Sequence, residues 1–224
     1  MHIFYVHSIN STQDHAKALS DLHLSAVSFW VQSATQTKGR GQRGRKWESD
    51  LGNLYLTGCF FKQTTIPGQL SIAVGVLISN ILKARLLNTE LKIGIKWPND
   101  LLISGRKYGG ILIEMEENIY VGIGINLSSH PENHLAAMPA AHLPTVIRDW
   151  LMKKIIENID DQFLEIQDFN VIQQLWWSFA KDCVNDWRLR EPINGDVIGI
   201  DSLGQLLIKT ADGKITARHQ TFTS

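Results

Sequence analysis

Two neighbouring apolar segments with glycines on one side only place the strongest constraint on the fold. Residues 107–116 read KYGGILIEME and residues 119–127 read IYVGIGINL. In the second segment isoleucine and valine alternate with Gly122, Gly124 and Asn126. Successive side chains of a strand point to opposite faces, so one face is apolar and the other is almost bare. A glycine-bearing strand is weak unless something lies close to it, so we expect a ligand or another backbone there. A tightly curved sheet or close helix packing would use the same glycines.

The rest of the chain alternates short apolar strands with helical patterns, which predicts an α+β layered domain. Further strands are expected at residues 2–7, 26–32, 53–61 and 93–97, and helices at 69–87, 144–167 and 171–184. Ser11 or Thr12 is expected to cap a helix near the N-terminus. The pattern changes after Trp187, where strand-like pieces at 196–200, 205–210 and 214–218 predict a small β-barrel. We therefore expect a main domain over residues 1–187 and a small one over 188–224.

Charge and cysteine content exclude several classes of protein. Lys and Arg total 22 and Asp and Glu total 22, so no global field would draw the chain onto nucleic acid or an anionic membrane. Cys59 and Cys183 have no C-x-x-C spacing, which favours reduced core thiols. The N-terminus lacks a signal-peptide pattern and no continuous apolar run approaches roughly 18 residues. We expect a soluble cytoplasmic protein whose anion site, if it has one, is local.

Such a local site is indicated by residues 36–47, which read QTKGRGQRGRKW. The spacing of Gly39, Gly41 and Gly44 satisfies the dinucleotide-binding fingerprint, but no helix pattern opens there and no acid follows about twenty residues later. The Walker A pattern also fails, because Arg45 and Lys46 stand where Lys and Ser or Thr are required. The cations and flexible backbone are typical of a loop that gathers around a phosphate-bearing ligand. The alternatives are a solvated basic loop or an arginine-glycine RNA-binding segment.

Four motifs in order resemble the catalytic domain of the biotin protein ligases. They are GRGQRGRKW at 39–47, KWPND at 96–100, KYGGILIE at 107–114 and GIGIN at 122–126. The resemblance covers about residues 3–190 and implies a fold similar to class II aminoacyl-tRNA synthetases, a mixed sheet flanked by helices. The remaining residues resemble the SH3-like barrel that ends these enzymes. Family members that repress transcription carry a winged helix-turn-helix ahead of this domain, which is not expected here because the first strand begins near residue 2.

The resemblance implies a reaction in two steps. Biotin and Mg-ATP would give biotinyl-5′-AMP and pyrophosphate, and biotin would then pass to a lysine of a biotin carboxyl carrier protein. Neither nucleic acid nor membrane is expected as a partner, and the oligomeric state is left open between monomer and homodimer. A lipoate or octanoate ligase of the same superfamily is the nearest rival, and an RNA-binding module using the basic loop is the rival from another class.

Site residues are carried over from the resemblance by position. The residues implied to contact biotin are Ser11, Thr12, Gln13, Gln36, Gly39, Arg40, Gly41, Gln42, Lys107, Gly110, Gly122 and Gly124. Those implied to contact the nucleotide are Arg43, Arg45, Lys46, Trp47, Asn99 and Asn126. Lys107, Asp100 and Arg40 are implied to be catalytic, with Lys107 following the carboxylate as it becomes an acyl phosphate and Asp100 receiving the acceptor lysine. Asp100 could instead cap the following turn, and Trp47 could close the core as well as touch adenine.

The chain departs from the family pattern at its C-terminal end, which reads HQTFTS, so the resemblance does not extend to contacts from the tail to ATP or to the carrier. His130 and His134 are four residues apart in a segment without a helical pattern, so we expect no metal site there. The metal expected is magnesium that enters with ATP.

A second departure gives a testable prediction. Gln42 stands where family members often have an arginine that retains the adenylate, and a neutral amide holds a phosphate less firmly than a guanidinium does. We expect the Gln42→Arg variant to release biotinyl-5′-AMP more slowly than the wild type, measured as a dissociation rate after rapid dilution. A wild-type rate no faster than that of the variant would contradict this prediction.

Overall fold

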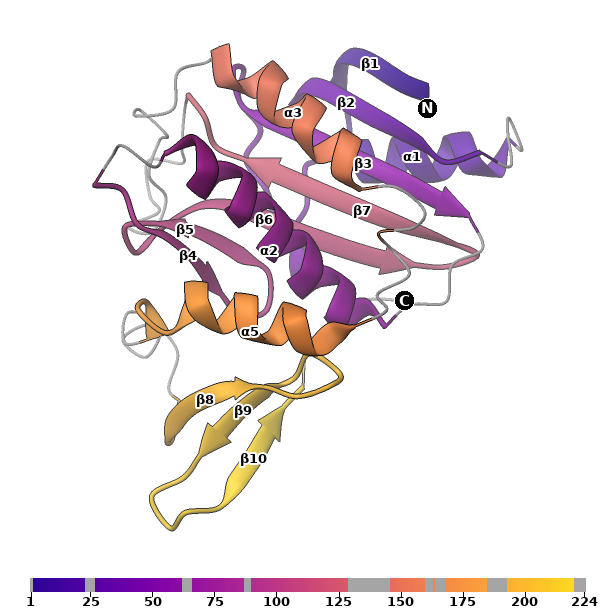
Figure 1. Cartoon of the computed structure of the whole chain (residues 1–224). Helices are drawn as coiled ribbons and strands as arrows, with labels where there is room; N and C mark the ends of the chain where they lie inside the picture. Colours follow the sequence, from indigo (N-terminus) through magenta and orange to yellow (C-terminus); the bar gives the residue numbers. More distant parts are fainter. Residues whose placement is uncertain are drawn as a thin grey trace.

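A seven-stranded mixed sheet forms the centre of the computed structural model, which describes residues 2–22, 27–61, 66–86, 90–128, 146–159, 163, 168–184 and 193–219 (Figure 1). The strands lie in the order β1-β2-β3-β7-β6-β5-β4. Their bounds are β1 (His2–Ile9), β2 (Phe29–Gln36), β3 (Leu54–Phe61), β4 (Ile93–Lys96), β5 (Asp100–Ile103), β6 (Arg106–Met115) and β7 (Asn118–Ile125). Strands β1 and β2 are parallel, and every other neighbouring pair is antiparallel. The predicted mixed sheet with flanking helices is confirmed.

Helices cover both faces of this sheet. One face packs against α2 (Pro67–Arg85), α3 (Val146–Asn158) and α5 (Phe169–Ala180), and α1 (Thr12–Asp21) lies on the opposite face (Figure 1). Helix α2 is long and apolar enough to cross a membrane by length and composition, but 61% of that stretch is buried inside the protein. It is the central helix of the core, because α3, α5 and three strands pack against it. Ser11 caps α1 by accepting a hydrogen bond from the Asp14 amide at 3.4 Å.

The two glycine-bearing strands are the neighbours β6 and β7, and their faces differ as the sequence predicts. Ile119, Val121, Ile123 and Ile125 are buried in the large core on the α2 side. Gly122 and Gly124 point to the α1 side, where Gly124 lies between Tyr55 of β3 and Gly110 of β6. On this side of the sheet, Gly110, Gly122 and Gly124 therefore form a bare strip that carries no side chains.

A second, three-stranded antiparallel sheet follows α5, in agreement with the expected small SH3-like β domain. It consists of β8 (Asp196–Ile200), β9 (Leu206–Lys209) and β10 (Ile215–Arg218) in the order β10-β9-β8. The sheet shares its core with the main domain, because Val197 and Leu206 belong to the same buried cluster as Trp97. The Trp97 indole also donates a 2.9 Å hydrogen bond to the Gly204 carbonyl. The expected domain boundary at 187/188 lies outside the described residues.

Several element bounds differ from the sequence-based expectation. Strand β2 begins three residues later than predicted and continues through polar residues to Gln36, because β1 pairs with it over its whole length. The apolar run after Asn99 forms a separate strand, β5, which was not predicted as one. The helix expected at 144–167 is present as α3 up to Asn158, and most of the remaining stretch lies outside the described residues.

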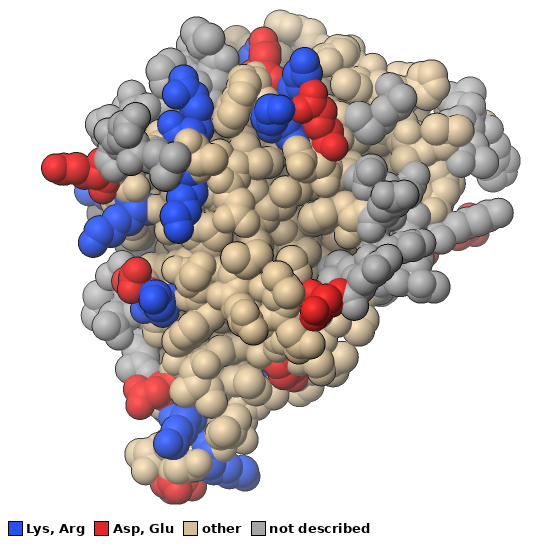
Figure 2. Space-filling view, in the orientation of Figure 1, with Lys and Arg blue, Asp and Glu red and all other residues tan. Residues whose placement is uncertain are grey.

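The surface of the face covered by α2, α3 and α5 carries basic and acidic side chains scattered around a largely uncharged centre (Figure 2). This agrees with the balanced composition of 22 cationic and 22 anionic side chains. On this face the charges form no continuous field of one sign that would favour binding to a polyanion.

Docking of the small sheet gives a stability prediction. A Cβ at Gly204 (φ +78°) would lie 2.8 Å from the Gly68 carbonyl carbon, whereas a Cβ at Gly213 (φ +84°) would meet nothing within 4 Å. Both alanine variants carry backbone strain of about 1 kcal/mol, but only Gly204→Ala adds a clash. We expect Gly204→Ala to lower the free energy of unfolding by at least about 1 kcal/mol more than Gly213→Ala, as measured by chemical denaturation. Equal losses would show that the contact with Gly68 is not needed.

Candidate active site

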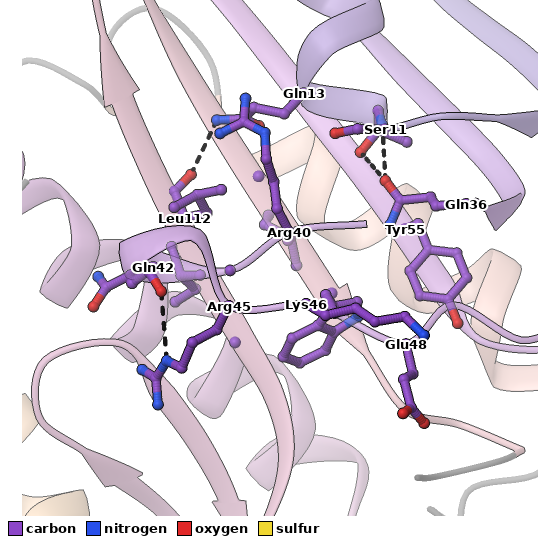
Figure 3. Close-up of a pocket in the computed structure, with 18 of the residues that line it drawn as sticks. Ser11, Gln13, Gln36, Arg40, Gln42, Arg45, Lys46, Glu48, Tyr55 and Leu112 are labelled. Atoms are coloured by element: carbon purple, nitrogen blue, oxygen red, sulfur yellow. Dashed lines mark hydrogen bonds between the residues drawn. The ribbon is translucent and has the colours of Figure 1, made fainter. Parts of the chain in front are cut away.

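The bare strip of the sheet, α1 and the basic loop enclose a cavity of about 260 Å³, the size expected for part of a small-molecule site (Figure 3). Sixteen of the residues predicted for the site line it. These are Ser11, Thr12, Gln13, Gln36, Arg40, Gly41, Gln42, Arg45, Lys46, Trp47, Asn99, Lys107, Gly110, Gly122, Gly124 and Asn126. Residues that are far apart in the sequence, from Ser11 to Asn126, thus meet at one cavity.

Three predicted site residues do not line this cavity. Gly39 is a buried residue of the loop itself, and a Cβ there would lie 2.5 Å from the Trp47 carbonyl oxygen, so a glycine is required for packing. Arg43 is exposed at the loop tip with a φ of 57°. Asp100 lies at the start of β5, beside the cavity and not in its wall. The cavity is also lined by five residues that were not predicted, namely Glu48, Tyr55, Ile111, Leu112 and Ile123.

The glycines of the bare strip make room for side chains of the protein itself. A Cβ at Gly124 would lie 2.7 Å from Cε2 of Trp47, and one at Gly110 would lie 3.1 Å from Cζ3 of the same ring. A Cβ at Gly122 would lie 2.6 Å from Oε1 of Gln13. The expected close approach is therefore made by Trp47 and Gln13, although all three glycines still border the cavity. Trp47 is half-buried, so it closes the core and offers the rest of its ring to the cavity.

A buried hydroxyl that the sequence analysis missed fixes the Gln13 side chain. Gln13 Nε2 donates to the carbonyls of Leu112 and Tyr120 at 3.5 and 3.3 Å. Its Oε1 lies 3.1 Å from the hydroxyl of Thr57, which is also 2.9 Å from the Thr12 hydroxyl. Thr57 is fully buried within an apolar strand, so its sequence context carries no sign of this role. Both N–H groups of Gln13 are used inside the protein, which leaves the amide oriented but not free to donate.

A second amide, that of Gln36, is oriented in the same way. Its Oε1 accepts from the Thr12 amide at 2.7 Å and from the Thr12 hydroxyl at 3.1 Å, and its Nε2 donates to Ser49 at 2.9 Å. One N–H of Gln36 remains beyond this bond, and the Ser11 hydroxyl, whose oxygen accepts from the Asp14 amide, has its own hydrogen to donate. This end of the cavity thus presents neutral donors and acceptors in fixed positions.

Lys107 and Asp100, both predicted to be catalytic, form an ion pair. Lys107 Nζ lies 2.6 Å from Asp100 Oδ1, and it also lies 5.1 Å from the centre of the Trp47 ring. The two side chains are only partly exposed, at 27% and 18%. The two residues belong to neighbouring antiparallel strands, in which Lys107 of β6 lies opposite Leu102, two residues along β5 from Asp100.

Arg40, the third predicted catalytic residue, has its charge balanced by carboxylates. Its guanidinium contacts both oxygens of Glu114 and lies 2.6 Å from Asp14. Burial alone would raise the pKa of Glu114, but the hydrogen bonds and charge of Arg40, together with the charge of Lys17, hold that pKa below its ordinary value. Arg40 borders the cavity, but its charge is used within the protein.

Two other cations of the loop, Arg45 and Lys46, are not paired with carboxylates. In the described part of the chain, neither Arg45 nor Lys46 forms an ion pair, and Arg45 Nε makes a long hydrogen bond to the Gln42 carbonyl at 3.4 Å. Both line the cavity (Figure 3). Arg45, Lys46 and Lys107 therefore line the same cavity as the carboxylate of Glu48 and the neutral groups of Gln13 and Gln36.

The cavity geometry agrees with comparisons to known proteins. The family model described as Biotin/lipoate A/B protein ligase family matches residues 5–126, which is more than half of the chain. The chain belongs to this family. It is 30% identical to the bifunctional ligase/repressor BirA of Bacillus subtilis, over 95% of this chain and 70% of that protein. It is 28% identical to the biotin–[acetyl-CoA-carboxylase] ligase of Paracoccus denitrificans, over 84% and 86% of the two chains.

Among solved structures, the chain is similar to the biotin protein ligase of Aquifex aeolicus in complex with biotin and ATP. The TM-score is 0.77 and the identity 26%, over 96% of this chain and 94% of that one. No group of three or more His, Cys, Asp or Glu side chains suited to a metal ion occurs within the described residues. The two histidines that we set aside as metal ligands, His130 and His134, lie outside those residues.

The packing of Trp47 on the bare strip gives a prediction with opposite signs for two glycines. We expect Gly124→Ala to lower the free energy of unfolding by about 1–3 kcal/mol, because the added methyl group overlaps the indole. Gly75→Ala in α2 is the control, because its Cβ would lie 3.5 Å from Ile111 in ordinary contact and alanine favours a helix by about 1 kcal/mol. Chemical denaturation measures both. A Trp47→Ala change should abolish the effect of Gly124→Ala, and an effect that persists would assign the clash elsewhere.

Proposed function

We propose that the protein activates biotin with ATP to biotinyl-5′-AMP and then transfers biotin to a specific lysine of a biotin carboxyl carrier protein. The observation that carries this proposal is one cavity lined both by oriented neutral groups, at Gln13 and Gln36, and by the cations Arg45, Lys46 and Lys107, of which Lys107 pairs with Asp100 beside the cavity. Family membership and the biotin and ATP complex of the Aquifex protein support it. Biotin has a neutral ureido ring at one end and a carboxylate at the other.

The neutral end suits the ureido ring. The ring carbonyl requires donors and its N–H groups require acceptors, and an oriented set of both discriminates better than a flexible one. The Ser11 hydroxyl and the spare N–H of Gln36 supply donors, and the Thr12 and Gln13 oxygens supply acceptors. Thr57 acts behind them, since it holds Gln13 and Thr12 in place.

The cations that line the cavity suit the first chemical step. A biotin carboxylate oxygen forms a bond to the α-phosphorus of ATP, and the bond from that phosphorus to the pyrophosphate oxygen breaks. Two anions must approach each other, so fixed cations lower the barrier by offsetting their repulsion and the charge that develops. Besides Arg40, three cations line the cavity: Arg45 and Lys46, which pair with no carboxylate among the described residues, and Lys107, which pairs with Asp100. Magnesium enters with ATP and is held mainly through phosphate oxygens.

The second step uses the other member of the ion pair. The acceptor amine forms a bond to the acyl carbon, AMP leaves, and the acceptor ammonium must lose a proton before it attacks. While Lys107 is paired with Asp100 at 2.6 Å, the carboxylate is occupied. A phosphate that draws Lys107 towards itself frees Asp100 to receive the acceptor lysine. The pair thus links adenylation to transfer.

The remaining features of the proposal rest on the family. The carrier is that of acetyl-CoA carboxylase or a related carboxylase, by analogy with the Paracoccus relative. We propose a cytoplasmic location and no nucleic-acid partner, in keeping with the balanced charge. A homodimer is compatible with this proposal, and size-exclusion chromatography with light scattering would decide it.

A reaction of purified protein with biotin, Mg-ATP and a carrier domain tests the proposal. Intact mass of the carrier scores transfer, and pyrophosphate release scores adenylation. We expect a single biotinyl addition with biotin and none with lipoate. Asp100→Asn should slow transfer about 10²-fold while adenylation changes little, because only the second step requires proton removal by this carboxylate. Lys107→Gln should slow adenylation by a similar factor, because it removes a cation from the reacting phosphate.

Lys153→Gln, an exposed change on α3, is the matched control and should leave both steps unchanged. Addition of lipoate in place of biotin would reassign the substrate within the family. Equal losses of both steps in Asp100→Asn would contradict the proposed division of roles. Absence of both adenylate and transfer in the wild type would refute the proposed activity.

A further inference from the structure

The basic loop, residues 36–47, contacts the rest of the protein through its base and through two side chains. It forms a hairpin in which Arg40 pairs with Lys46, and the Trp47 amide donates to the Gly39 carbonyl at 2.8 Å. Its base is tied to the end of β1 by backbone bonds from Thr37 and Lys38 to Ile9 and Asn10. Beyond the base, the described contacts that reach α1 and the sheet come from two side chains, Trp47 on the returning arm and Arg40 on the outgoing arm.

The contact made by Arg40 uses its whole guanidinium. Nη1 and Nη2 bind the two oxygens of Glu114, with Nη2 at 2.9 Å from Oε2. Nε and Nη2 also bind Asp14 Oδ1 at 3.1 and 2.6 Å. A planar fork held by two carboxylates has one orientation, which a lysine could not reproduce. The outgoing arm of the loop is therefore fixed simultaneously to β6 and to α1.

Glu114 is built to stay charged in a buried position. Its side chain is only 5% exposed, and Lys17 Nζ lies 3.2 Å from its second oxygen. Lys17 in turn pairs with Glu116 at 2.5 Å. The cluster contains two cations and three carboxylates, counting Asp14, so Arg40 has no surplus charge to offer a phosphate. Arg40 therefore contributes to the cavity by holding the loop in position, and its charge is not available to bind a ligand.

We propose that Glu114 is a positioning residue that, through Arg40, holds the basic loop over the cavity and so determines how long a bound acyl-adenylate is retained. Glu114 does not line the cavity, so it acts through Arg40 and not on the ligand. Loss of the carboxylate leaves the guanidinium with one partner, the half-exposed Asp14, which is a far weaker anchor than a buried bidentate pair. The identity of the ligand rests on the proposed function, whereas the attachment of the loop does not.

Trypsin tests the attachment without any assumption about activity. Arg43, Arg45 and Lys46 are exposed in the loop and form a set of cleavage sites whose reactivity increases when the loop leaves the sheet. We expect Glu114→Gln to accelerate cleavage within the loop about tenfold in the folded, ligand-free protein. Glu116→Gln is the matched control, because Glu116 shares Lys17 with Glu114 but is exposed and does not contact Arg40. The control should be cleaved at the wild-type rate.

Adenylate retention tests the consequence. We expect biotinyl-5′-AMP to dissociate about tenfold faster from Glu114→Gln than from the wild type or from Glu116→Gln. Arg40→Lys, which keeps the charge but loses the fork, should have the same effect from the other side of the contact. The double variant should be no worse than either single one, because both remove the same contact. Additive effects would overturn the proposal, since they would show that the two residues act separately.

The other outcomes of the cleavage and dissociation experiments also decide for or against the proposal. Thermal unfolding of each variant distinguishes loosening of the loop from loss of the fold, and if Glu114→Gln does not fold, Arg40→Lys carries the same test. Loop cleavage at the wild-type rate in either variant would overturn the attachment. Faster cleavage with unchanged adenylate dissociation would overturn the link to retention. If the wild type forms no adenylate, the proposed function fails, and the trypsin experiment still decides whether Glu114 holds the loop.

Discussion

Contact between the Trp47 ring and the glycines of β6 and β7 is the interaction on which the rest of the site depends. Side chains at Gly110 and Gly124 would occupy the space that the indole fills, because their Cβ atoms would come within 3.1 and 2.7 Å of it. The indole anchors the returning arm of the basic loop, and Lys107 lies over its ring. A single steric condition thus brings the loop, the sheet and Lys107 together. Tight packing makes such a condition strict, since interiors adjust little to an added methyl group.

Charge in this protein acts locally and in pairs. The whole chain is balanced, with 22 charges of each sign, and most ionic groups around the cavity are matched within a few ångströms. Arg40 is held by Glu114 and Asp14, and Lys107 by Asp100. Arg45 and Lys46 differ, because no carboxylate within the described residues pairs with them. Of the five cations of the loop, Arg40 fixes its shape, and Arg45 and Lys46 line the cavity without a carboxylate partner among the described residues.

The small C-terminal sheet supports the site through its packing against the KWPND motif. Trp97 belongs to the KWPND motif, and its ring is buried with Val197 and Leu206 of that sheet. Asn99, two residues later, lines the cavity and exchanges hydrogen bonds with Ile111 of β6. One turn thus has the docked sheet on one side and the cavity on the other. The shared core explains why the second sheet packs on the main domain and does not form a separate body.

The sequence by itself determined the alternation of faces in β7, the existence of a local cation-rich loop and most of the residues that surround the cavity. These features depend on the period of two in a strand and on the chemistry of short motifs, which are local. It also predicted most strands and helices, but not the extent of β2, whose polar end is a strand only because β1 pairs with it. The sequence did not predict that Thr57 supports Gln13, since Thr57 lies in an ordinary apolar strand.

Only the tertiary structure decided which charges are free and what lies against the glycines. Arg40 and Glu114 are 74 residues apart in sequence, and nothing local to either motif predicts that the fold joins them. The glycines predict a close approach, but the indole of Trp47 and the amide of Gln13 that make it come from other elements. Pairing between distant side chains depends on how the strands and helices are placed, and the placement is a property of the whole core. For this reason the sequence predicted most of the residues that line the cavity, and the fold decided which of them pair with one another.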